Sequence, residues 1–194
     1  MFVVGISGVA RSGKNLLCNL LMESLRQKGI SSKQFALAAE LKNDCQEFLK
    51  TKCSLNVWSD LTEDKDKFRE FLVWYGDLKR KQSNGRYWIE TLNSRLATYS
   101  GDVAFITDVR YDIYNRDEFY WITEEKDGII IHLKRLINND YIEPANDHEK
   151  FNDKRIQQKS DINIVWRTFK DPYSEKSVMK IVDETTSRII NFMN

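Results

Sequence analysis

The chain has 194 residues, of which 41% are hydrophobic, 30% charged and 12% aromatic, and this composition excludes disordered, collagen-like and disulfide-scaffold proteins. Thirty Lys and Arg residues against 29 Asp and Glu residues give a formal charge of +1, which removes the simplest argument for a nucleic-acid or membrane partner. Cys18, Cys45 and Cys53 lack metal-ligand spacing and are typical of reduced thiols in the cytoplasm.

Strand and helix patterns alternate at the start of the chain and are followed by consecutive helices. The run at 2–6 is β-branched and ends near glycines, which is typical of a strand buried on both faces of a parallel sheet. Leucines then recur at helical spacing over 14–28. The next expected elements are a strand at 34–37, a helix through 41–49, and amphipathic helices at 62–80 and 86–98.

The second half of the chain alternates again. It has apolar runs of strand length at 103–107, 129–133 and 161–166. A crossover helix is expected within 112–126, and an amphipathic helix at 178–192 completes the pattern. Strands that alternate with helices indicate an α/β fold. We therefore expect a single domain with a five-stranded parallel sheet, interrupted by a helical insertion at about 38–100.

One segment carries a phosphate-binding pattern. It reads Gly8-Val-Ala-Arg-Ser-Gly-Lys14 and lies between the first expected strand and the first expected helix. In the pattern G-x-x-x-x-G-K, backbone N–H groups and a helix N-terminus converge on phosphate oxygens. Gly8 and Gly13 provide the backbone freedom, and Lys14 is expected to reach the β- and γ-phosphates of a nucleotide. Arg11 and Ser12 are further candidate donors, although Arg11 can also be an ordinary surface charge.

Two side chains are candidate ligands of Mg²⁺. The residue after Lys14 is usually Ser or Thr in this motif, but here it is Asn15, followed by Leu16, and the amide oxygen of Asn15 can bind the ion directly or through water. Asp108 ends an apolar strand and Arg110 follows it. Because ligands bind at the carboxyl ends of parallel strands, we expect Asp108 to hold Mg²⁺ and Arg110 to pair with phosphate. A strand-end Asp can otherwise be a turn or helix cap.

A basic and aromatic segment lies between these two motifs. Arg69, Arg80 and Arg86 are candidates to bind the phosphate of an acceptor. Trp74 can stack on a base or pack against the protein, whereas core packing is favoured for Trp88. A nucleic-acid groove here has weak support, because the patch is short and the chain is neutral.

Other patterns argue against several classes of enzyme. The sequence lacks Cys-His metal spacing, a nucleophile elbow and a G-x-G-x-x-G dinucleotide pattern, which argues against structural zinc, acyl transfer and hydride transfer. His132 lies in an apolar run and is expected to be a core histidine. His148 lies in a polar segment and is either a surface residue or a binding residue.

The motifs taken together resemble a known family. They are the phosphate-binding segment, Phe-Ala-Leu-Ala-Ala-Glu-Leu-Lys at 35–42, Phe-Leu-Val-Trp-Tyr-Gly at 71–76 with Arg80 and Tyr-Trp-Ile at 87–89, Ile-Thr-Asp-Val-Arg-Tyr at 106–111, Ile-His-Leu-Lys-Arg at 131–135, Asn-Asp-His-Glu at 146–149 and Asp-Ile-Asn at 161–163. Their order over nearly the whole chain resembles the bacteriophage-type deoxynucleoside monophosphate kinases, with animal-type phosphomevalonate kinases as more distant relatives.

The resemblance implies a three-layer α/β/α fold of the P-loop nucleoside-monophosphate-kinase type. It implies ATP as phosphate donor, Mg²⁺ as cofactor and a deoxynucleoside monophosphate as acceptor. The residues that it implies for catalysis are Lys14, Arg11, Asp108, Arg110 and Arg80. It adds Lys42 to the acceptor-binding residues, Leu16 and Arg135 to the ATP-binding residues, and a short lid at about 136–149.

The expected setting is the cytoplasm, that of the host if the chain is phage-encoded, with a homodimer compatible with the resemblance. No nucleic-acid or membrane partner is expected, and no stretch of the sequence approaches the ~20 apolar residues of a membrane span. Two alternatives stay open. One is a kinase of another small phosphorylated acceptor such as phosphomevalonate, and the other is a nucleotide-dependent, nucleic-acid-binding ATPase.

Overall fold

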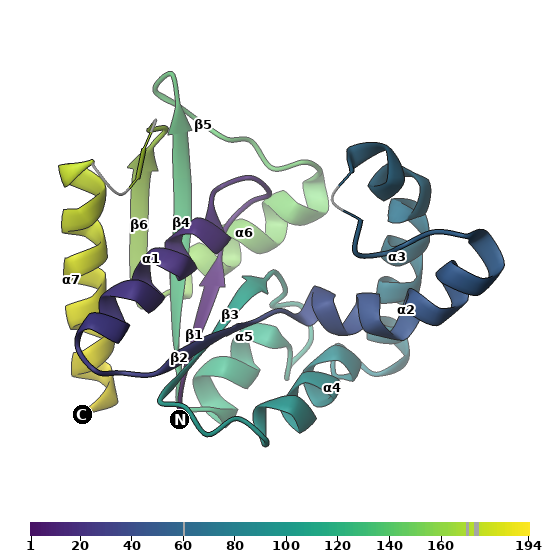
Figure 1. The fold of residues 1–194 in the computed structure, drawn as a ribbon, viewed down its shortest axis with the longest axis horizontal. Coiled ribbons are helices and arrows are strands. Elements are labelled where there is room, and N and C mark those ends of the chain that lie inside the picture. The colour runs from purple at the N-terminus through teal and green to yellow at the C-terminus, as the bar shows by residue number, and fades with distance from the viewer. Residues whose placement is uncertain (60, 170, 173–174) are drawn as a thin grey trace. The chain divides into compact units, whose positions relative to one another are not determined.

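The computed structural model describes residues 1–59, 61–169, 171–172 and 175–194. The chain divides into two compact units (Figure 1). Unit 1 comprises Met1–Phe35 and Ser100–Asn194, and unit 2 comprises Ala36–Tyr99. The insertion expected at 38–100 nearly coincides in sequence with unit 2, while its role in acceptor binding stays a prediction.

Unit 1 contains a mixed sheet, and the predicted α/β class is confirmed. Its strands are β1 (Phe2–Ser7), β2 (Ser32–Phe35), β3 (Val103–Val109), β4 (Ile129–Ile137), β5 (Asp140–Tyr141) and β6 (Ile162–Arg167). The order is β2-β3-β1-β4-β5, and β6 pairs with β4 as well. The pairs β1–β3, β1–β4, β2–β3 and β4–β6 are parallel, and β4–β5 is antiparallel.

The prediction of a five-stranded, wholly parallel sheet was therefore wrong. The sixth strand, β5, arises because the chain reverses directly after β4. Asn138 and Asn139 occupy the reversal with φ of 52° and 73°. Two central residues with positive φ form the tight turn that matches the twist of a hairpin, and asparagine tolerates this conformation better than most residues. Leu136 then pairs with Tyr141.

The helices of unit 1 are α1 (Lys14–Gln27), α5 (Glu118–Tyr120), which continues into a π-helical turn at Trp121–Glu125, α6 (Asp147–Lys159) and α7 (Lys176–Met193). The crossover helix expected within 112–126 is thus reduced to a short helix and one wide turn. α6 was not predicted, because its sequence is strongly polar and buries little beyond Asn152 and Ile156.

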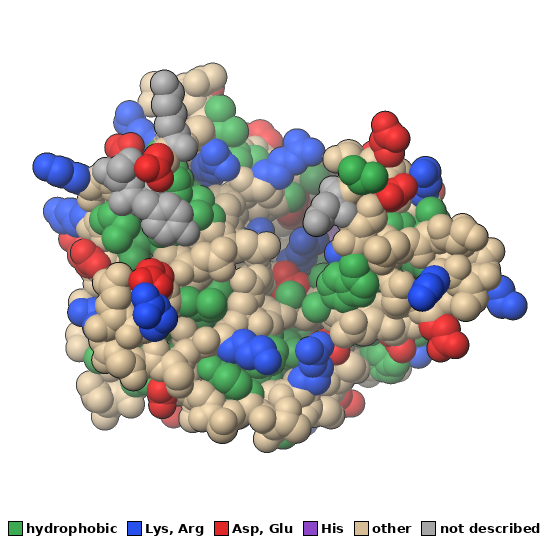
Figure 2. Space-filling view, in the orientation of Figure 1, with side chains coloured by type: hydrophobic (Ala, Val, Ile, Leu, Met, Phe, Trp, Pro, Cys, Tyr) green, Lys and Arg blue, Asp and Glu red, His purple; other side chains and the backbone are tan. Residues whose placement is uncertain are grey.

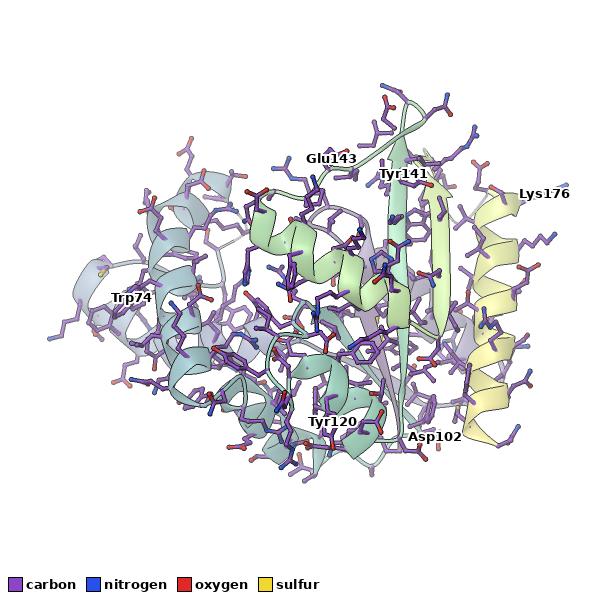
Figure 3. The ribbon with its side chains drawn as sticks, turned by 180° about the vertical axis from the view of Figure 1, so that it is seen from behind. Trp74, Asp102, Tyr120, Tyr141, Glu143 and Lys176 are labelled. Atoms are coloured by element: carbon purple, nitrogen blue, oxygen red, sulfur yellow. The ribbon has the colours of Figure 1, made fainter. Side chains whose placement is uncertain are left out.

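The main core of unit 1 lies between the sheet and the pair α1 and α7. Alternate side chains of β4, Ile129, Ile131 and Leu133, join the leucines of α1 in one buried cluster. The intervening side chains point to the other face, where His132 contacts α6. α1 lies in front of the strands in Figure 1, and α5 and α6 lie in front of them in Figure 3, which is turned by 180°. Burial of each such apolar side chain stabilises the fold by about 1.5–3 kcal/mol.

Unit 2 is helical and has a small core. Its helices are α2 (Leu37–Cys53), α3 (Thr62–Gln82) and α4 (Tyr87–Leu96). One buried cluster consists of Cys45, Leu49, Val57 and Phe68. Larger apolar side chains remain at the surface of this unit, and Trp74 is 60% exposed.

The distribution of charge on the surface agrees with the near-neutral composition, and the length and polarity of the helices bear on whether any of them spans a membrane. On the face drawn in Figure 2, Lys and Arg side chains are interspersed with Asp and Glu. Among the described residues, the helices are too short or too polar for any of them to cross a bilayer.

Candidate phosphate-binding site

Residues 8–13 form the loop between the carboxyl end of β1 and the first turn of α1, and we call them the candidate phosphate loop. Gly8, Arg11 and Gly13 all have positive φ, of 137°, 65° and 98°. At Gly8 the conformation also coincides with a close approach, because a Cβ there would lie 2.3 Å from the carbonyl oxygen of Leu133. The loop therefore depends on glycine at this position for both its backbone conformation and its packing against β4.

The end of β6 holds the other side of the loop. Trp166, which is 3% exposed, donates its indole N–H to the carbonyl oxygen of Ser12 over 2.9 Å. A Cβ on Gly13 would lie 2.7 Å from the Trp166 ring, so the indole packs directly on the glycine. Sequence reasoning identified the strand but missed this contact, since 154 positions separate the two residues.

Ser12 has a buried hydroxyl. Its side chain is fully inaccessible, and its Oγ has no hydrogen-bond partner among the described residues. Buried polar atoms are almost always hydrogen-bonded, so such an atom requires an explanation. Ser12 lies in the candidate phosphate loop, and its expected contact with a phosphate oxygen stays a prediction.

Lys14, the first residue of α1, turns back into the loop. Its Nζ donates to the carbonyl oxygens of Gly8 and Val9 over 2.7 Å and 2.9 Å. Burial, and next the positive charge of Arg110, lower the pKa of Lys14 to about 8, and nearby carboxylates including Glu149 act in the opposite direction. The lysine is thus enclosed at the point where the motif predicts contact with transferable phosphate.

The end of β3 adds the second predicted group of residues. β3 runs parallel to β1, so its carboxyl end lies at the same edge of the sheet as the loop. Asp108 is half-buried and Arg110 is exposed, and both exert charge effects on Lys14. The backbone N–H of Arg110 is anchored by the buried carboxylate of Glu118 over 2.7 Å. Asp108 and Arg110 therefore both lie within electrostatic range of Lys14.

The side chain of Asn15 is held by a neighbouring strand. Its Oδ1 accepts a hydrogen bond from Gln34 Nε2 over 3.2 Å. The Nε2 of Gln34 also donates to Thr107 Oγ1 over 3.0 Å. A carbonyl oxygen can accept twice, so Asn15 keeps capacity for a hard cation. Asn15 and Asp108 each carry an oxygen donor of the kind that Mg²⁺ prefers. The described residues contain no larger group of metal-binding side chains.

The far end of β4 provides Arg135. Its Nε donates to Thr168 Oγ1 over 3.2 Å, and one terminal nitrogen lies 3.5 Å from the carbonyl oxygen of Arg11. Arg135 therefore lies beside the candidate phosphate loop, and its expected contact with a nucleotide stays a prediction.

A cavity of about 340 Å³ borders the loop and α6. Its lining includes Val9 of the loop, Asp153 of α6, and Tyr141 and Glu143, which are labelled in Figure 3. Beside it, His132 is 1% exposed and its Nε2 lies 2.8 Å from Asp153 Oδ1. The prediction that His132 is a satisfied core histidine is confirmed.

α6 also reaches the loop directly, which sequence reasoning missed. The carboxylate of Glu149, in the first turn of α6, accepts a hydrogen bond from the backbone N–H of Ala10 over 2.9 Å. The neighbouring His148 is exposed and packs on the ring of Tyr111, with 5.5 Å between the ring centroids. Capping-type spacing at 146–149 was a visible signal for the helix start.

Most of the predicted acceptor-binding residues lie in unit 2, but Arg110, which was also expected to bind the acceptor, lies in unit 1. Trp88 is 5% exposed and donates to the carbonyl oxygen of Gly76, so its expected core role is confirmed. Arg80 is also buried, at 6% exposure. The others lie nearer the surface of the unit: Arg86 pairs with Glu90, Arg69 pairs with Asp66, Lys42 lies over the ring of Trp58, and Trp74 is exposed.

Unit 2 contains a polar cluster that sequence reasoning did not identify. Asp44 Oδ2 accepts hydrogen bonds from the hydroxyls of Tyr75 and Tyr87 over 2.7 Å and 3.3 Å. The ammonium of Lys79 lies 4.3 Å from the centroid of the Tyr87 ring. Burial, and then the bond to Asp44, raise the pKa of Tyr75, so its hydroxyl stays a donor.

Comparisons with known proteins add little to this geometry. No protein-family model matches the chain, and no curated protein matches it. Among solved structures, the crystal structure of APE1195 matches with a TM-score of 0.43 and 13% sequence identity, over 100% of this chain and 97% of that chain. Similarity at this level supports no inference about this chain.

Proposed function

We propose that this chain is a kinase that transfers the γ-phosphate of ATP to a deoxynucleoside monophosphate. One observation carries the proposal. The loop at 8–13 joins a buried strand to a helix, contains a buried serine hydroxyl for which the described residues provide no partner, and encloses Lys14 at its end. Backbone freedom, donors within the loop and an enclosed cation are features that polyphosphate binding requires.

The topology supports the same proposal. The parallel strands follow the order β2-β3-β1-β4-β6, so the connections after β1 and β3 leave in opposite directions. Ligands of open α/β sheets bind at such a switch point. The candidate phosphate loop follows β1, and Asp108 and Arg110 lie at the end of β3. A three-layer fold of the P-loop nucleoside-monophosphate-kinase type is part of the proposal.

The proposed chemistry needs no protein nucleophile. An oxygen of the acceptor phosphate attacks the γ-phosphorus, the bond from that phosphorus to the β–γ bridging oxygen breaks, and the products are ADP and a deoxynucleoside diphosphate. Such transfers depend on positioning and on neutralising charge. Lys14 would follow the transferred group, and Arg110 and Arg11 would stabilise its developing charge.

Mg²⁺ belongs to this proposal. Bound Mg²⁺ would neutralise charge on the β- and γ-phosphates of ATP. Asp108 is the residue proposed to hold it, and Asn15 is the second oxygen donor. Gln34 would fix the amide of Asn15 so that its oxygen keeps one orientation.

The acceptor is assigned to unit 2. Arg80, Arg86 and Arg69 are proposed to bind its phosphate, with Lys42 adding positive charge. Burial of Arg80 within a helical unit favours a fixed guanidinium, which suits bidentate contact with phosphate. Trp74 is exposed and is proposed to stack on the base.

The experiment is a panel of acceptors. Purified protein with ATP and Mg²⁺ is incubated with each deoxynucleoside monophosphate, with ribonucleoside monophosphates and with phosphomevalonate, and products are separated by chromatography. We expect a diphosphate from at least one deoxynucleoside monophosphate. If phosphomevalonate is the only compound that yields a product, then the acceptor is phosphomevalonate and not a deoxynucleoside monophosphate. ATP hydrolysis that DNA or RNA stimulates, with no phosphorylated small product, would overturn the proposal in favour of a nucleic-acid-dependent ATPase.

A further inference from the structure

Glu149 occupies an unusual position at the start of α6. The helix is capped by Asn146, whose side-chain oxygen accepts from the backbone N–H of Glu149 over 2.8 Å. An acid three residues after such a cap usually returns the hydrogen bond to the backbone of the cap residue itself. The carboxylate of Glu149 is directed elsewhere.

Both oxygens of this carboxylate accept from backbone N–H groups outside α6. Oε2 accepts from Ala145 over 2.6 Å, and Oε1 accepts from Ala10 over 2.9 Å. Ala145 belongs to the segment 136–149 that leads into the helix, whereas Ala10 lies in the candidate phosphate loop, 139 positions away from Glu149. Hydrogen bonds to a carboxylate are roughly twice as strong as neutral ones.

Glu149 also lies within electrostatic range of the lysine in the loop. Its negative charge raises the pKa of Lys14, against the larger effect of burial and the effect of Arg110, and Asp108 and Asp153 act in the same direction as Glu149. A helix cap alone would not require this proximity.

We propose that Glu149 is a positioning residue that ties the segment 136–149 to the candidate phosphate loop through Ala145 and Ala10. Its kinetic consequence rests on the proposed function. While both hydrogen bonds to Glu149 are present, the candidate phosphate loop and the segment 136–149 keep one relative position, so that ATP binds to a preorganised loop. We call this pair of hydrogen bonds the tie. Loss of the tie would leave the reacting groups in place but raise the cost of ordering the loop around ATP.

The first test is kinetic and uses Glu149→Gln. The amide oxygen of glutamine can accept from one of the two N–H groups, but its NH₂ group cannot accept from the other. We expect the KM for ATP to rise about tenfold, as loss of one charged hydrogen bond predicts, with kcat changed less than about threefold. Asp147→Asn is the matched control, because it removes the same charge from the same turn of α6. Equal effects of the two variants on KM would overturn the proposal.

The second test does not depend on catalysis. Amide hydrogen exchange at Ala10 is measured by NMR on the full chain without nucleotide. We expect exchange about tenfold faster in Glu149→Gln and unchanged in Asp147→Asn. Asn146→Ala weakens the helix cap while leaving the carboxylate, and Ala10 should stay protected there. Unchanged exchange in Glu149→Gln would refute the tie.

The two proposals fail separately. A wild-type chain that binds no ATP overturns the proposed function, and the exchange measurement at Ala10 still decides whether Glu149 forms the tie. A chain that transfers phosphate while Glu149→Gln leaves both KM and exchange unchanged keeps the proposed function and rejects the role of Glu149.

Discussion

The two units of this chain hold their candidate residues by different means. In unit 1, the candidate phosphate loop continues a strand whose neighbours are fully buried, and Trp166 and the backbone of β4 fix both sides of it. In unit 2, several predicted acceptor residues lie on helix surfaces, and the pair between Arg69 and Asp66 is mostly exposed.

This difference separates two ways of making a binding site. A loop built from backbone N–H groups and braced by a sheet keeps its geometry whether or not a ligand is present. The geometry of exposed side chains on helices is held only weakly, because surface ion pairs contribute only about 0–1 kcal/mol to stability. Substitutions in unit 1 should therefore act on ATP binding or on the rate of phosphate transfer, and those at the surface of unit 2 on acceptor affinity.

The largest effect is expected for Lys14→Ala. Removal of the enclosed ammonium should lower kcat/KM for phosphate transfer by at least about 10³-fold, because charge stabilisation in the transition state is lost. Lys28→Ala, at the exposed end of α1, is the control and should keep full activity. Circular dichroism and thermal unfolding verify that both variants fold. Near-wild-type turnover in Lys14→Ala would refute the assignment of the loop.

A pair of core substitutions tests whether the units differ in stability. Phe105→Ala removes a fully buried ring from β3 and should lower the free energy of unfolding by about 3–5 kcal/mol. Phe68→Ala removes a buried ring from the small core of unit 2, so it should increase hydrogen exchange in α2 and α3 while the strands stay protected. Equal loss of protection in β1 and β3 in both variants would show that the units unfold together.

A smaller effect on rate is expected for Asp108→Asn. Loss of the carboxylate should lower the Mg²⁺-dependent rate by about 10²-fold, with acceptor affinity changed less than about threefold. Asp183→Asn, on the exposed side of α7, removes the same charge and should leave both quantities unchanged. Titration of Mg²⁺ at saturating ATP measures the effect. A larger loss of acceptor affinity than of rate would assign Asp108 to the acceptor.

The smallest effect is expected for Trp166→Phe. This change shortens the ring that packs on Gly13 and removes the N–H donor to Ser12, so stability should fall by about 1 kcal/mol and affinity for ATP by a few fold. Trp74→Phe is the matched substitution in unit 2, and its exposed ring should make stability insensitive to the change. Chemical denaturation and calorimetry compare the two. Equal stability losses would remove the contrast between the units.

The sequence predicted the features of this chain that depend on local patterns. The β-branched run of β1, the leucines of α1 and the glycines between them are neighbours in the chain, so the loop could be identified without the fold. The contacts that brace this loop could not. Trp166 and Glu149 reach it from 154 and 139 positions away, and no periodicity encodes which distant residue will touch a loop.

The missed elements have physical reasons of their own. α6 buries few side chains, so its hydrophobic pattern is too weak to indicate a helix. β5 has two residues, below the length at which alternation can be recognised. For the tryptophans, Trp88 was correctly expected in the core, whereas the pattern left Trp74 undecided because a residue on a helix flank can be buried or exposed.

The hairpin of β4 and β5 has a consequence for how copies of this chain behave at high concentration. β4 continues past the end of β1, and the exposed backbone of such an overhang is a template on which another polypeptide can add a strand. β5 folds back and occupies the hydrogen-bonding groups of Leu136 and Ile137. A two-residue strand that contributes little to the core thus helps to protect the sheet from aggregation.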